Sequence, residues 1–87
     1  MELESKTNFK LGKIVEVHWV DACARGGWDD PEFYEDLSPV QVRTAGYQLK
    51  RNKECITIAS TESIDNSINQ AISIPIAWCK KIKVIRK

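Results

Sequence analysis

Short runs in which apolar and polar residues alternate constrain this chain more than any other feature. Near its start, Val15, Val17 and Trp19 share one face, while Glu16 and His18 occupy the other. A period of two is the repeat of a β-strand with one buried face, and valine, isoleucine and tryptophan favour strands. Runs of this kind occupy residues 13–20, 40–51, 55–60, 72–76 and 82–84. The sequence therefore predicts an all-β protein with five short strands.

The second run changes phase in its middle. Val40 and Val42 face one way, whereas Tyr47 and Leu49 have the opposite parity. Gly46 stands near the change, and a glycine inside a strand marks a bulge or a sharp bend. Such a bend lets a small sheet curl back on itself, so we expect this strand to turn a corner.

The connections between the runs carry ordinary turn signals. Residues 52–53 predict a tight hairpin turn, and the polar segment TESIDNSINQ (61–70) predicts a loop. Pro75 removes a donor from the sheet and belongs at a strand end or an edge. Residues 76–80, IAWCK, fit a single 3₁₀ turn before the last strand.

The segment 21–39 is the longest stretch without a strand pattern. It contains a Gly26-Gly27 pair, and Pro31 can take the first position of one helical turn in PEFYEDL. Connections of this length without a role in a sheet are usually functional. We therefore expect this first loop to carry interaction residues.

The layout resembles the SH3-like and Sm-like small barrels, in which one 3₁₀ turn joins the last two strands. More narrowly, five motifs resemble a group of small phage-encoded proteins: V-H-W-V-D (17–21), G-W (27–28), T-A-G-Y (44–47), I-T-I-A (56–59) and I-P (74–75). Tyr47 stands where that group more often has tryptophan. The resemblance covers about residues 13–85. It implies a fold and a phage origin, but no reaction.

The resulting prediction is a small five-stranded SH3-like antiparallel β-barrel over residues 13–87, preceded by a polar N-terminal arm, residues 1–12. It has a long acidic first loop. A domain of this size is near the lower limit of stability, so we expect a homo-oligomer that buries strand edges or the leftover Val20 and Ile85. The predicted core is Val15, Val17, Trp19, Val40, Val42, Ile56, Ile58, Ile72, Ile74, Ile82 and Val84.

Charge is distributed unevenly along the 87 residues, although the formal net charge is only +1. Residues 21–38 hold six acids against one base, a net charge of −5, so the remainder carries +6. The bases gather at residues 50–53 and 80–87. This asymmetry indicates either partner surfaces or two solvated faces.

The cysteines and the chain start indicate a cytoplasmic protein, in an infected host cell if the origin is a phage. Cys23, Cys55 and Cys79 are an odd, widely spaced set, and two of them lie in apolar contexts where a free thiol acts as a small hydrophobe. No apolar run approaches the roughly 20 residues of a membrane span. The first residues are polar and of mixed charge, unlike a signal peptide.

Groups for catalysis do not converge in the sequence. His18 is the only histidine, and no cysteine pair has the C-x₂₋₄-C spacing of a zinc site. The four glycines form no phosphate-cradling motif. Adjacent acids such as Asp29-Asp30 are more often solvating than catalytic. We expect a protein that is not an enzyme and needs neither a metal nor another cofactor.

Binding is the better hypothesis. Trp28 and Arg25 offer an aromatic face and a guanidinium within four residues, a pairing that can stack a ring and hold a phosphate. The alternative is that Trp28 covers the open end of the barrel as a lid. Asp21, Tyr47 and Arg51 complete the predicted ligand-binding set. Tyr47 is equally suited to the core, and Asp21 is equally suited to forming a turn.

Phe33 and Tyr34, two aromatic residues in an acidic loop, indicate a protein interface. Together these features suggest a non-catalytic phage-type accessory protein that counters a host defence. It would sequester a small nucleotide signal or block a host protein. One alternative is a nucleic-acid-binding Sm/SH3-like module, although the pI of about 7.7 and the acidic loop oppose it. Another is a component of the virion or of its assembly.

Overall fold

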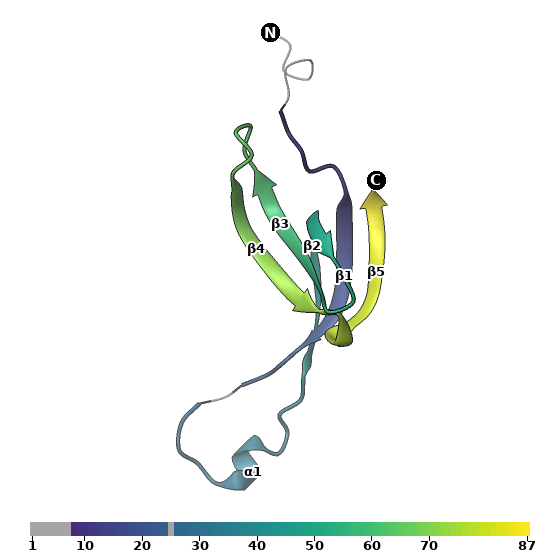
Figure 1. Cartoon of the computed structure of the whole chain (residues 1–87). Coiled ribbons are helices and arrows are strands. Elements are labelled where there is room, and N and C mark those ends of the chain that lie inside the picture. Colours follow the sequence, from purple (N-terminus) through teal and green to yellow (C-terminus); the bar gives the residue numbers. More distant parts are fainter. Residues whose placement is uncertain (1–7, 25) are drawn as a thin grey trace.

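A computed structural model of the protein describes residues 8–24 and 26–87, and it shows five antiparallel strands in one sheet (Figure 1). The strands are β1 (Ile14–Asp21), β2 (Val40–Arg51), β3 (Cys55–Glu62), β4 (Ile68–Pro75) and β5 (Cys79–Arg86). Their order in the sheet is β4-β3-β2-β1-β5. The all-β antiparallel prediction is confirmed. The outer strands β4 and β5 are not paired with each other, so the described sheet is open rather than closed into a barrel.

Different parts of β2 pair with its two neighbouring strands. Its first part pairs with β1, and the part from Tyr47 onward pairs with β3. A Cβ added to Gly46 would lie 2.6 Å from the carbonyl oxygen of Ala59, so only glycine allows the β3 backbone to pass this close. An irregularity in β2 is present, as the change of phase predicts, but the register shift falls between Gln48 and Lys50 rather than at the glycine.

The segment 61–70 forms the ends of β3 and β4 and a short turn between them, so the predicted loop is wrong. The Ser63 N–H donates to the Ser67 carbonyl oxygen (2.9 Å), and Asn66 adopts a φ of 72°, which asparagine tolerates. Every residue of β4 before Ile74 is exposed. Polar residues can therefore occupy this strand, and the apolar alternation that would reveal it is lost.

The other predicted turns are confirmed. The Asn52 side-chain oxygen accepts hydrogen bonds from the N–H groups of Glu54 and Cys55 (2.8 and 2.9 Å) and closes the β2–β3 hairpin. The 3₁₀ turn η2 (Ile76–Trp78) joins β4 to β5, and α1 (Pro31–Tyr34) is one helical turn with proline at its start. No helix in the described parts of the chain has the length and apolar content needed to cross a membrane.

A small apolar core holds the sheet together. Its buried residues are Val15, Val17, Trp19, Ile56, Ile58, Ala59 and Ile74. Val42, Ile76, Cys79 and Ile82 pack against them and are partly buried. All three cysteines are free, as predicted.

Three predicted core residues, Val40, Ile72 and Val84, are exposed instead. Ile72 and Val84 lie in the outer strands, which have a neighbour on one side only. Val40 is the first residue of β2, at the root of the long loop. Ala59, absent from the predicted core, is buried where β3 passes Gly46.

The described end of the N-terminal arm is tied to the sheet, while residues 1–7 lie outside the description. The N–H groups of Lys10 and Leu11 donate to the Glu62 carboxylate at 3.0 and 3.1 Å. The hydrogen bond from Lys10 is the main reason that the pKa of the Glu62 carboxyl is lowered. This contact joins the arm to the distal end of β3.

Candidate functional site

A β-bulge in β5 interrupts the pairing with β1. Trp19 pairs with Cys79, but the preceding His18 pairs with Lys81, which leaves Lys80 as the extra residue. Bulges bend a strand, re-aim its side chains and are common beside active sites. Lys80 lines three neighbouring hollows. We call this region the Lys80 site.

The first hollow, of about 290 Å³, is rich in positive charge, and we call it the cationic hollow. It is lined by His18, Trp19, Gln41, Val42, Arg43, Lys80 and Lys81, with no carboxylate among them. The sheet register explains the grouping, because Arg43 and Lys81 are the cross-strand partners of His18 on its two sides. The register thus places two cations, Arg43 and Lys81, on either side of His18.

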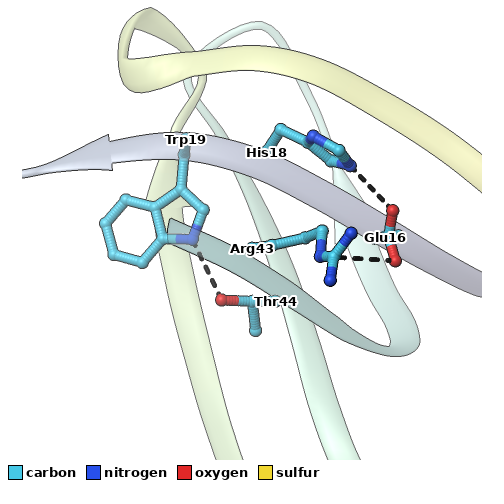
Figure 2. Close-up of polar contacts among 5 residues, drawn as sticks. All are labelled: Glu16, His18, Trp19, Arg43 and Thr44. Carbon is cyan, nitrogen blue, oxygen red and sulfur yellow. Dashed lines mark hydrogen bonds and ion pairs between the residues drawn. The ribbon is translucent and has the colours of Figure 1, made fainter. Parts of the chain in front are cut away.

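Glu16 balances part of this positive charge (Figure 2). Its carboxylate lies 2.7 Å from His18 Nε2 and 3.9 Å from Arg43 Nε. The hydrogen bond with His18 lowers the pKa of the Glu16 carboxyl, and the Arg43 charge adds a smaller effect in the same direction. An ionised Glu16 thus orients the His18 ring at the edge of the cationic hollow.

The second hollow, of about 380 Å³, lies at the root of the long loop, and we call it the Trp78 hollow. It is lined by Val20, Asp21, Ala22, Pro39, Ala77, Trp78 and Lys80. Trp78 is 44% exposed and stacks on Trp19, with ring centroids 6.4 Å apart and ring planes at 15°. An aromatic ring that is supported by another ring and still exposed can stack a planar group.

Trp19 fixes the position of this platform. Its Nε1–H donates to Thr44 Oγ1 at 3.0 Å, and the side chain is only 8% exposed (Figure 2). The indole is therefore held by a hydrogen bond as well as by the core. Trp78 rests on a rigid neighbour rather than on a mobile side chain.

The third hollow, of about 240 Å³, shares Lys80 and Lys81 with the cationic hollow. It is lined by Arg51, Ile76, Cys79, Lys80, Lys81 and Ile82. Burial raises the pKa of the Cys79 thiol, so this group is protonated and acts as an apolar lining at neutral pH.

The structure brings two of the five predicted ligand-binding residues to the Lys80 site. Asp21 lines the Trp78 hollow, and Arg51 lines the third hollow. Tyr47 lies elsewhere, because it pairs with Ile14 at the opposite end of β1. There it lines a separate hollow with Phe9, Leu11, Glu62 and Arg86.

Trp28 is fully exposed in the long loop, so the interpretation as a lid over the core is wrong. It is not among the residues that line the three hollows around Lys80. Arg25, its predicted companion, lies outside the described residues. The role of this pair in ligand binding stays a prediction.

Phe33 and Tyr34 lie in α1 and hold the loop in shape. Their rings meet edge to face with centroids 5.0 Å apart. The Tyr34 hydroxyl donates to the Gly27 carbonyl oxygen at 2.5 Å. This contact joins two parts of residues 26–37, which we call the acidic arm and which projects from the sheet (Figure 1).

The sequence interpretation missed four residues of the Lys80 site: Arg43, Trp78, Lys80 and Lys81. The available signal was W-C-K-K at 78–81, an aromatic residue followed closely by two lysines. Arg43 had no such signal, because only the sheet register brings it next to the same hollow.

Comparison with known protein families, with curated proteins and with solved structures finds no match to this chain. Within residues 8–24 and 26–87, no cluster of three or more His, Cys, Asp or Glu side chains is placed to hold a metal ion. The site is therefore interpreted from the chemistry of its own side chains.

Proposed function

We propose that the protein is a non-catalytic binding protein whose Lys80 site takes a small ligand with both a phosphate and a planar ring, such as a nucleotide. One observation carries this proposal: Lys80 is shared by a hollow lined with cations and a hollow lined by an exposed tryptophan. Phosphates form charge-assisted hydrogen bonds with lysine and arginine. Stacking a base on an aromatic ring contributes about 1–3 kcal/mol.

The lining residues suggest a role for each part of such a ligand. Arg43, Lys80 and Lys81 would hold the phosphate in the cationic hollow, and Trp78 would stack the base. Asp21, at the edge of the Trp78 hollow, could accept a hydrogen bond from an exocyclic amine. Apolar walls with a few placed polar groups are typical of small-ligand sites.

We further propose that the sheet is an SH3-like barrel in its opened form. The order β4-β3-β2-β1-β5, the close approach of β2 and β3 at Gly46 and the 3₁₀ turn before β5 support this assignment. A phage-type role in counter-defence, by sequestering the ligand, rests on the motif resemblance and on analogy of fold.

Calorimetric titration with linear and cyclic nucleotides tests the binding proposal, with the matching nucleosides and inorganic phosphate as controls. We expect at least one nucleotide to bind more tightly than its nucleoside, because the cations act on the phosphate. Lys80→Gln and Trp78→Leu should each abolish or strongly weaken this binding. Lys53→Gln, in the exposed β2–β3 turn, is the matched charge control and should leave it unchanged. No heat from any nucleotide, with tryptophan fluorescence unchanged, would refute the proposal.

A nucleic acid is the second candidate, favoured by the row formed by Arg43, His18 and Lys81 across three strands. It predicts that a single-stranded oligonucleotide binds although mononucleotides do not. Its affinity should then fall steeply as salt rises, because several phosphate contacts release counterions. Binding by mononucleotides alone would exclude this candidate.

A further inference from the structure

The acidic arm presents charge and apolar surface outside the sheet and outside the Lys80 site. Residues 26–37 contain five acids and no base. Trp28 is fully exposed, and Phe33 is 45% exposed. Tryptophan is among the residues most enriched at the energetic centres of protein interfaces. An exposed tryptophan among acids indicates a surface for a basic, partly apolar partner.

This surface is held in shape before any partner arrives. The Tyr34 hydroxyl donates to Gly27, and the Leu37 N–H donates to the Tyr34 carbonyl oxygen at 3.1 Å. The Phe33 N–H donates to the Asp30 carbonyl oxygen at 3.0 Å. A preorganised loop loses less conformational entropy on binding than a loose one.

The last part of β5 presents positive charge together with exposed apolar residues. Residues 83–86 place the exposed Val84 and Ile85 between two cations, Lys83 and Arg86. β5 is also an outer strand, and its free edge can accept another chain. This segment combines positive charge with apolar surface, as the acidic arm combines negative charge with apolar surface.

The two surfaces do not meet within one molecule. The long loop leaves the sheet after Asp21, at one end of β1, while Arg86 pairs with Ile14 at the other end. Figure 1 shows α1 and the C-terminus at opposite ends of the molecule. A strand rises about 3.3 Å per residue, so the two ends of β1 are roughly 23 Å apart.

We infer that the acidic arm of one copy docks on residues 83–86 of a second copy. Complementary surfaces at opposite ends of a molecule give a head-to-tail contact, which produces either a closed ring or an open chain. The inference is independent of the nucleotide proposal. Neither Lys83 nor Arg86 lines the three hollows around Lys80.

Sedimentation velocity of the full chain from 1 μM to 1 mM, at low and at high salt, tests the inference. We expect species larger than the monomer, with association weakened as salt rises because the contact pairs opposite charges. Trp28→Ala should weaken association at least tenfold, as loss of an interface anchor does. A chain that stays monomeric at every concentration would overturn the inference.

Reciprocal charge reversal identifies the two surfaces. Asp29→Lys with Asp30→Lys reduces the net charge of residues 26–37 from −5 to −1, and Lys83→Glu with Arg86→Glu gives an acidic strand end. Each double variant alone should be monomeric, and an equimolar mixture should associate again. Lys53→Glu, a charge reversal outside both surfaces, should associate as the parent does. Recovery of association in the mixture would also show that both variants fold. The inference would be contradicted if either double variant associated on its own, or if the mixture did not associate.

Discussion

Trp19 and Trp28 are nine positions apart in the sequence but lie in opposite surroundings. Trp19 is buried on β1, stacks on Trp78 and donates a hydrogen bond to Thr44. Trp28 is fully exposed in the acidic arm. The same side chain thus serves the core in one region and has no packing role in the other. The comparison teaches that the sheet carries the stability of the fold and that the arm is available for contacts with partners.

The largest expected difference comes from removing each of these two rings. Trp19→Ala should destabilise the protein by about 3–5 kcal/mol, because it leaves a cavity in a small core. Trp28→Ala should change stability by no more than about 0.5 kcal/mol, because the ring buries nothing. Urea denaturation of the two variants measures both values. Equal losses would show that the arm is part of the core.

Substituting one glycine in the sheet and one in the arm tests the same difference between the two regions, with smaller expected losses of stability. Gly46→Ala should cost about 1–3 kcal/mol, because the new methyl group would press on the Ala59 carbonyl oxygen and the backbone must shift. Gly26→Ala, in the arm, has nothing within 4 Å of the added methyl group and should cost nothing measurable. Thermal melting of both variants measures the two losses of stability. A Gly46→Ala variant as stable as the parent would argue against the close crossing of β2 and β3.

A pH effect is expected in the sheet region. The pKa of Glu62 is lowered in the folded protein, mainly by the hydrogen bond from Lys10, so its stabilising effect is present above the ordinary glutamate pKa of about 4.5. That effect is lost as the pH falls through the lowered pKa. Glu62→Gln should therefore reduce the melting temperature at pH 7 more than at pH 2. A pH-independent difference between the two proteins would contradict this explanation.

The smallest effect on stability is expected in the arm. Tyr34→Phe removes the hydroxyl that donates to Gly27 but keeps the ring that meets Phe33. Global stability should stay within about 0.5 kcal/mol of the parent, since the arm is exposed. Amide hydrogen exchange in residues 26–37 should become faster, and exchange in β1 should not change. Faster exchange in both regions would show that arm and sheet unfold together.

The strands were predictable because their signal is local. Alternation in β1 and β3 follows from one buried face, and the Asn52 turn and the proline-initiated α1 depend on a few adjacent residues. The start of β4 was missed because both of its faces are exposed there and no alternation is needed. Burial of Ile72 and Val84 could not be judged, because exposure depends on which strands lie at the edges.

The Lys80 site was only partly predictable. Asp21 and Arg51 were chosen for their chemistry, and the fold brings both near Lys80. The bulge itself depends on how β5 aligns with β1, two strands far apart in the sequence. Arg43 joins the site through a cross-strand pairing that composition and spacing do not reveal.

Replacing the whole long loop tests most directly whether the sheet and the arm are separable. Asp21 and Val40 are directly paired, so an Asn-Gly turn can join them in place of the 18 residues 22–39. Shortening the loop should stabilise the protein by about 2 kcal/mol through the lower entropy cost of closing it. Thermal melting should therefore show a cooperative transition at or above the parent temperature. A variant that fails to fold, or melts about 10 °C lower, would contradict the account, since it would mean that the loop contributes more than 1 kcal/mol to the fold.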